Sequence, residues 1–116
     1  MAQDFERTLQ RNISNNSGSP TELRAAADSD DAIIGVRCTN TSGTAVNVTV
    51  YVENSSTNYF IIKEAPIPTG GSLELIDGGS KVVLMSGDAV KAYASAASSV
   101  DIITSVVDTI SAYKRK

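Results

Sequence analysis

The stretch Val46-Asn-Val-Thr-Val-Tyr-Val52 places a valine at every second position. Because successive side chains of a β-strand point to opposite faces, this period of two predicts a strand with one buried, valine-lined face. Upstream, Ile34, Val36 and Cys38 follow the same period, and the polar run 39–44 between the two segments is typical of a turn. The two segments together predict a pair of antiparallel strands.

The residues after Val52 also show patterns typical of β-strands and turns. Residues 59–63 are apolar almost throughout, which predicts a strand buried on much of both faces. Pro66 and Pro68 remove two backbone donors, so residues 65–71 are expected to be a connection or an irregular strand edge, at which the chain changes sheets. Shorter strand-like segments, separated by Gly, Asp and Ser turns, follow at residues 73–75, 81–85, 90–94 and 100–110.

These segments amount to about seven short strands, with no convincing long helix between them. They predict an all-β fold, an antiparallel immunoglobulin-like β-sandwich with an extended N-terminal arm. The cysteine pair and buried Trp of immunoglobulin domains are absent, so the likeness is one of layout only. The core side chains are small and mostly aliphatic, so association with neighbours is expected to contribute to stability.

The first 31 residues differ in composition from the rest. They carry few large apolar side chains, and residues 12–20 are a low-complexity run rich in Asn, Ser and Gly, so the segment cannot bury enough surface to fold alone. The composition predicts an N-terminal arm over 1–31, a β-sandwich domain over 32–111 and a basic C-terminal tail over 112–116.

Two interpretations of the arm stay open: a flexible terminus, and an arm that becomes ordered against a neighbouring subunit. In the second, the contact residues are Phe5, Leu9 and Ile13, whose spacing of i, i+4, i+8 is that of one helix face. Residues 21–27 contain good helix formers behind a capping residue, so they too are expected to form a helical turn on docking.

Composition argues against most enzymes. The chain has 116 residues, no His, no Trp and a single cysteine, Cys38. Ser-His-Asp and Cys-His nucleophile systems and the common zinc sites need residue types that are missing. We therefore expect no catalytic residue, no cofactor and no metal site, and we interpret the acidic residues Asp28, Asp30 and Asp31 as a solvated linker.

Charge and hydropathy limit the partners. Ten basic and thirteen acidic residues give a net charge of −3, which argues against a broad nucleic-acid-binding surface. No apolar run is long enough for a membrane-spanning helix, and the first residues are too polar for a signal peptide. The expectation is a protein that binds neither nucleic acid nor membrane and acts where it is made or inside a particle.

Cys38 shares a strand face with Ile34 and Val36, so a buried structural role is favoured. The alternative is a thiol near the surface that forms an intersubunit disulfide in a symmetric assembly. The basic residues Lys114, Arg115 and Lys116 at the end of the chain have two readings: a solvated end, and a subunit contact that meets the acidic cluster of the next copy.

Three segments together carry a resemblance to a known group. They are Ile34 to Val52, with the sequence IGVRCTNTSGTAVNVTVYV, Tyr59 to Leu75, with YFIIKEAPIPTGGSLEL, and Lys81 to Asp88, with KVVLMSGD. Over residues 32–111 the chain resembles small β-sandwich virion structural proteins of tailed bacteriophages. The resemblance implies a neck or collar, tail-attached or head-decoration component, located in the virion and assembled in the cytoplasm of the host bacterium.

Two classes of function therefore stay open. The first is a non-enzymatic structural protein of a phage particle, a homo-oligomer that contacts other neck, tail or capsid proteins. The second is an adhesive or glycan-binding module, because β-sandwiches often present loops to surface glycans. Sugar sites commonly use exposed aromatic platforms, and Tyr51 and Tyr59 flank one loop of this chain.

Overall fold

The computed structural model describes residues 4–25, 30–76 and 82–108, and these residues form nine β-strands. The strands are β1 (Asp4–Gln10), β2 (Thr21–Arg24), β3 (Asp31–Asn40), β4 (Val46–Asn54), β5 (Thr57–Ile67), β6 (Ser72–Glu74), β7 (Val82–Leu84), β8 (Ala89–Ala94) and β9 (Val100–Asp108).

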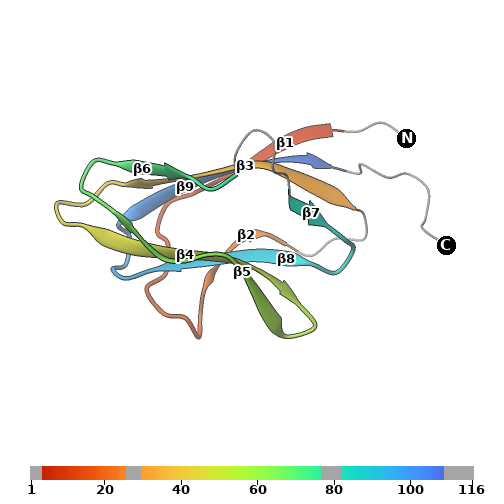
Figure 1. The fold of residues 1–116 in the computed structure, drawn as a ribbon, viewed down its shortest axis with the longest axis horizontal. Helices are drawn as coiled ribbons and strands as arrows, with labels where there is room; N and C mark the ends of the chain where they lie inside the picture. The colour runs from red at the N-terminus through yellow and green to blue at the C-terminus, as the bar shows by residue number, and fades with distance from the viewer. Residues whose placement is uncertain (1–3, 26–29, 77–81, 109–116) are drawn as a thin grey trace.

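Two sheets pack face to face (Figure 1). Sheet A has five strands in the order β1-β9-β3-β6, with β7 also paired to β3, and sheet B has four in the order β2-β8-β4-β5. Every pairing is antiparallel. The predicted antiparallel β-sandwich is confirmed. The seven expected strands correspond to β3 through β9, and the N-terminal segment adds two more.

The core lies between the sheets and is lined by the alternating residues that the sequence pattern singled out. Val48 and Val50 of β4 are fully buried, and they face sheet A, where Val36, Ile102 and Val106 are buried as deeply. The side chains are small, so the two sheets are held by many modest apolar contacts.

The N-terminal segment corrects a prediction, because its described residues are strands where helical turns were expected. β1 pairs with β9 and β2 pairs with β8. Phe5 and Leu9 are four residues apart, and this spacing also puts two side chains on one face of a strand, so it does not distinguish the two structures. Ile13 and Leu23 are buried in the core of their own chain. The division at residue 31 stays a prediction.

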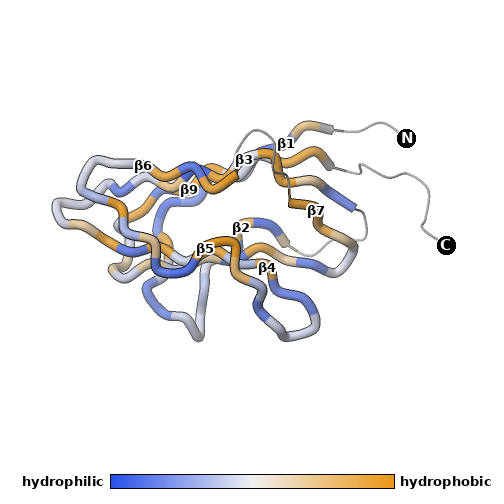
Figure 2. Tube along the Cα trace, in the orientation of Figure 1, coloured by the Kyte–Doolittle hydropathy of each residue, from blue (hydrophilic) through white to orange (hydrophobic). Residues whose placement is uncertain are grey.

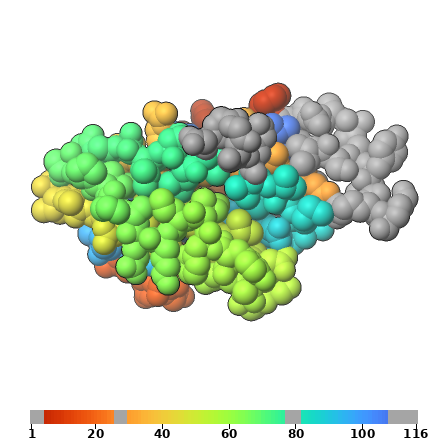
Figure 3. Space-filling view, in the orientation of Figure 1, coloured from red at the N-terminus to blue at the C-terminus, as the bar shows by residue number. Residues whose placement is uncertain are grey.

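The chain changes sheets between β5 and β6, as the two prolines predicted. In the space-filling view the green atoms of this segment run from the lower layer to the upper one (Figure 3). Asn40, at the end of β3, secures the crossing: its side-chain amide donates to the carbonyls of Thr44 at 2.8 Å and Ile67 at 2.9 Å. Its backbone N–H donates to the carbonyl of Gly71.

The apolar run 59–63 is not buried on both faces, which corrects a second prediction. It belongs to β5, an edge strand of sheet B, and Tyr59 and Phe60 are 59% and 45% exposed. The pairing of β5 with β4 shifts register twice, and Glu64 has a φ of 53°. An edge strand with such irregularities turns part of its apolar surface to solvent.

Polar loops project from sheet B between β1 and β2 and between β4 and β5, and Figure 2 shows both in blue and white below the orange segments of the strands. The loop between β1 and β2 is anchored beside β8, since the backbone N–H of Ala94 donates to the carbonyl of Ser14 at 2.8 Å. This anchoring places polar loop residues at the rim of the outer face of sheet B.

Candidate functional site

The outer face of sheet A carries exposed apolar side chains on its first strand. Phe5 and Leu9 of β1 are 79% and 56% exposed, and they lie opposite Val107 and Ile103 of β9. Together with Ile34 of β3 these residues form what we call the outer apolar strip. Two shallow hollows of about 290 Å³ each open along it, one lined by Phe5 and Ile34 and the other by Leu9 and Ile103.

The opposite side of β1 is tied to the rest of the chain by polar contacts. The Arg24 guanidinium of β2 pairs with Glu6 at 2.9 Å and with Asp31 at 3.0 Å. Burial alone would lower the pKa of Arg24, but the two carboxylates outweigh it and raise the pKa above its ordinary value. The Gln10 amide donates to the backbone carbonyl of Glu22 at 3.2 Å. β1 is therefore held in its own chain with its apolar side left uncovered by the described residues.

The acidic cluster differs from its interpretation as a solvated linker. Asp30 and Asp31 are 5% and 2% exposed, and Asp31 is engaged by Arg24 of the same chain. Asp28 lies outside the described residues, as do Lys114, Arg115 and Lys116, so the predicted contact of the basic tail stays a prediction. For Asp31, burial leaves little surface for a tail from another copy to reach.

Cys38 is buried in the core on the inner face of sheet A, which agrees with the favoured structural role. Burial raises the pKa of its thiol to about 12, and the nearby Glu74 carboxylate adds to the shift. A thiol so protonated and enclosed is unreactive at neutral pH, because the thiolate is the nucleophile. The intersubunit disulfide has no exposed sulfur to form from in this fold.

The predicted contact residues separate into two groups. Phe5 and Leu9 are brought together on the outer apolar strip, whereas Ile13 is fully buried between the sheets of its own chain. Sequence patterns could not predict that Ile103 and Ile34 lie beside Phe5 and Leu9. These residues are brought together by the pairing of β1 with β9 and of β9 with β3, which are far apart in the sequence.

The outer face of sheet B is organised differently, because its aromatic side chains pack around one tyrosine and bury it, while Phe60 stays partly exposed. Tyr51 is only 3% exposed, and its ring lies 5.5 Å from that of Phe60 and 6.3 Å from that of Tyr93. Burial raises the pKa of Tyr51. Lys63 sits 4.9 Å above the Phe60 ring. Tyr51 therefore cannot form an exposed platform with Tyr59.

A second ion pair borders this aromatic group. The Lys91 ammonium donates to Glu53, and this hydrogen bond raises the pKa of Lys91. The charges on this border of sheet B are therefore paired across neighbouring strands β8 and β4 within the chain.

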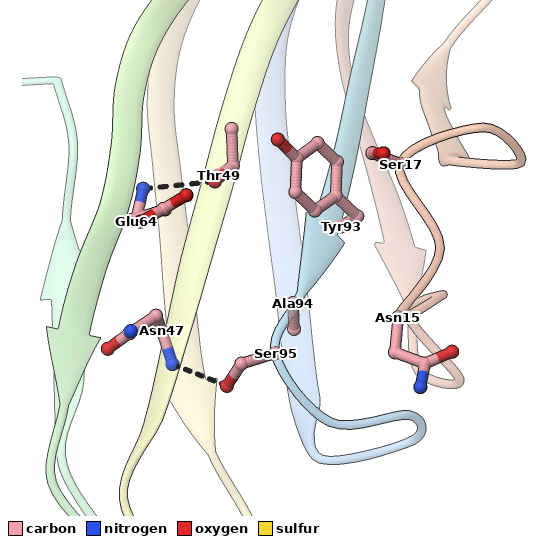
Figure 4. Close-up of a pocket in the computed structure, with 8 residues that line it drawn as sticks. All are labelled: Asn15, Ser17, Asn47, Thr49, Glu64, Tyr93, Ala94 and Ser95. Atoms are coloured by element: carbon pink, nitrogen blue, oxygen red, sulfur yellow. Dashed lines mark hydrogen bonds between the residues drawn. The ribbon is translucent and has the colours of Figure 1, made fainter.

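A polar hollow of about 420 Å³ lies beside the aromatic group (Figure 4). Glu64 of β5, Thr49 of β4 and Tyr93 of β8 line it from three adjacent strands, and Asn15 and Ser17 approach from the loop before β2. Thr49 supports its wall: the Thr49 hydroxyl accepts a hydrogen bond of 2.9 Å from the Glu64 backbone N–H. The sequence patterns missed this hollow, because its residues come from four separate segments.

The described parts of the chain hold neither a cluster of metal-ligating side chains nor a membrane-crossing helix. Within 4–25, 30–76 and 82–108, no three His, Cys, Asp or Glu side chains group as metal ligands would. The same residues contain no helix of the length and apolarity that crossing a membrane requires.

Comparison with known proteins supports the fold. No protein-family model matches the chain, and no curated protein matches it. A structure of Bacillus endospore appendages, a family of disulfide-linked pili, is similar over 95% of this chain and 88% of that one, with 15% identity and a TM-score of 0.53. The Eiger TNF structure from S. frugiperda is 8% identical over 95% and 89% of the two chains, with a TM-score of 0.46. The first likeness shows a shared fold, and the second adds no argument.

Proposed function

We propose that this chain is a non-enzymatic structural subunit of a tailed bacteriophage particle, a homo-oligomeric neck, collar or tail-associated component, with head decoration as a variant of its location. The phage assignment rests on the sequence resemblance over residues 32–111. The fold is compatible with a structural role, since a similar sandwich occurs in an appendage protein. The particle is the environment in which the outer apolar strip would be covered.

One observation carries the oligomeric part of the proposal. Phe5 and Leu9 keep 79% and 56% of their surface exposed on a strand that is already paired within its own chain. Ordered, neighbouring apolar side chains at a protein surface are typical of sites where another protein binds. Covering them would add stability to a sandwich whose own core side chains are small.

The first test is the mass of the full chain in solution, measured by light scattering over a range of concentrations. Wild type is expected to self-associate, and the double variant Phe5→Ser/Leu9→Ser is expected to dissociate at least tenfold more readily, since two apolar contacts are lost. Tyr59→Ser removes an exposed aromatic from sheet B and serves as the control. A wild type that is monomeric at high concentration contradicts the proposal.

The second test addresses the particle itself. Antibody labelling of phage particles from the producing host, viewed by electron microscopy, is expected to mark the neck, tail or head. Labelling confined to host material outside particles contradicts the phage assignment.

A second candidate function is supported by the hollow of Figure 4. Its lining combines the Tyr93 ring with amide, hydroxyl and carboxylate groups, a set that suits the hydroxyls and apolar faces of a sugar. On a glycan array, Tyr93→Ala and Glu64→Gln would abolish binding in this case, and Tyr59→Ala would not. Equal glycan binding by the wild type and all three variants would rule out this site.

A further inference from the structure

The edges of the two sheets differ in how open they are to another strand. β2 has four residues and a register shift, β5 has two register shifts and contains Pro66, and β6 and β7 have three residues each. Short, bulged or proline-containing edges resist pairing with another chain. These four edges are therefore protected.

β1 has none of these protections. It pairs with β9 in unbroken register from Asp4 opposite Asp108 to Gln10 opposite Ile102, and its sequence DFERTLQ contains no proline or glycine. A regular edge of this length presents backbone N–H and C=O groups to which another strand can bind. Four of its side chains are exposed: Phe5, Glu6, Arg7 and Leu9.

We propose that β1 pairs antiparallel with β1 of a second copy of this chain, with Thr8 opposite Thr8, so that the two A sheets become one continuous sheet. This inference deepens the proposed function and rests on it. The pairing is isologous: the same edge serves both copies across a two-fold axis.

Charge and strand length together select this register, because centring on Gln10 opposes no like charges but pairs only Gln10 itself within β1. A two-fold axis normal to the sheet requires one residue to face itself, and the choice of that residue fixes every other pair. Centring on Arg7 or on Glu6 places like charges directly opposite each other. Centring on Phe5 sets Asp4 against Glu6, and centring on Leu9 sets Arg7 against Arg11. Like charges directly opposite are destabilising.

Centring on Thr8 avoids all of these clashes. Glu6 then faces Gln10 of the second copy, a pair that can form a hydrogen bond, and Arg7 faces Leu9. Phe5 lies diagonal to Leu9 of the second copy, within reach of an aromatic side chain. On the outer face Phe5 faces Arg11 of the second copy, and Phe5 and Leu9 of the two copies lie side by side across the axis, so the pairing covers part of the β1 surface that one copy leaves exposed.

Cysteine cross-linking tests the register directly in the full chain. Thr8→Cys is expected to form a covalent dimer under mild oxidation, because directly opposed residues lie within disulfide distance. In Glu6→Cys or Gln10→Cys alone, the two new thiols are about 13 Å apart in this register, beyond disulfide reach. Each alone should give about tenfold less dimer than Thr8→Cys, whereas a mixture of the two should cross-link efficiently.

The wild type, with Cys38 buried, is the control for background cross-linking. Preferential cross-linking of Arg7→Cys, or no more dimer from Thr8→Cys than from the controls, overturns the proposed register. If light scattering still shows self-association in that case, the proposed function survives and only this pairing fails. If the wild type is monomeric as well, both fail.

Discussion

The outer faces of the two sheets both carry large apolar side chains, but they differ in how far these side chains are buried within one chain. On sheet B, Tyr51 is buried under Phe60 and Tyr93 of its own chain, although Phe60 itself is 45% exposed. On sheet A, Phe5 and Leu9 stand on the first strand with no described side chain above them to bury them. Sheet B therefore buries its central outward aromatic within one chain, whereas Phe5 and Leu9 on sheet A stay exposed.

The difference follows from what lies on each face. Sheet B has long hairpin strands and a polar loop that fold back over its rim, so aromatic and charged groups find partners locally. Sheet A ends in a regular strand in which Glu6 pairs with Arg24 and Gln10 donates to the Glu22 carbonyl, while Phe5 and Leu9 lie on the other face with Arg7 between them. A face that remains apolar after such pairing is suited to a partner.

The largest effect we expect is on thiol reactivity across sheet A. Cys38 lies on its inner face with a pKa of about 12, so at pH 8 its thiolate fraction is about a thousandfold below that of an ordinary thiol. In Leu9→Cys, a thiol reagent should modify the new cysteine at least about a hundredfold faster than Cys38. Equal rates would show that the two faces of this sheet are not distinct.

The pKa of Cys38 also predicts a change of stability with pH. The folded state keeps the thiol proton up to about pH 12, whereas the unfolded state loses it near 9.0. The contribution of this thiol to folding is therefore full below pH 9 and decreases as pH rises toward 12. Cys38→Val should lose less stability than wild type between pH 8 and pH 10.5 in urea unfolding, and a parallel decline would contradict the assignment.

Two truncations in the N-terminal segment compare a buried side chain, Ile13, with an exposed one, Leu9. Ile13→Ala should lower the free energy of unfolding by about 3 kcal/mol, because it empties a fully buried site. Leu9→Ala, made in dilute protein, should change it by less than about 0.5 kcal/mol. Urea unfolding measures both. Similar losses would mean that Leu9 is already covered in the isolated chain.

A smaller effect is expected at the wall of the hollow on sheet B. Thr49→Val removes the acceptor of the Glu64 backbone N–H and should cost about 1–2 kcal/mol. The same substitution at Thr39, a partly exposed residue of β3 in sheet A, should cost less than about 0.5 kcal/mol. If both variants unfold at the wild-type urea concentration, the Thr49 hydroxyl does not support the bulge in β5.

The smallest effect we expect is that of Phe5→Ser on a single chain. Phe5 is 79% exposed, so in dilute protein its removal should change the free energy of unfolding by less than about 0.5 kcal/mol. At high concentration the same variant should be less stable than wild type, because association stabilises the folded state by mass action. A stability difference that does not depend on concentration would contradict the outer apolar strip as an interface.

Much of the sandwich could be predicted from local patterns. The period-two valines of β4 and two residues of β3, Val36 and Cys38, are core positions, and Pro68 lies where the chain crosses between sheets, just after β5 ends. Ile34 was predicted to share that buried face, but a register shift in β3 turns it to the outer face and buries Ile33 in its place. In these segments one face of the strand is buried and the other is not, so the alternation of apolar and polar side chains predicts which residues lie in the core.

The remaining features depend on contacts that sequence patterns do not contain. The prediction of a helix in the N-terminal segment was wrong because the spacing of Phe5 and Leu9 fits a strand as well as a helix. The segment is a strand because it pairs with β9, which lies almost a hundred residues away in the sequence. The hollow on sheet B combines Asn15, Glu64 and Tyr93, which only the sheet order brings together.

Hydrogen–deuterium exchange in the backbone of β1 tests the central claim most directly. The peptide covering residues 4–10 should be strongly protected at high protein concentration and should lose part of that protection on dilution, while a peptide from β4 should be unaffected. Protection of residues 4–10 that is the same at all concentrations would show that the edge of sheet A binds no second copy of this chain.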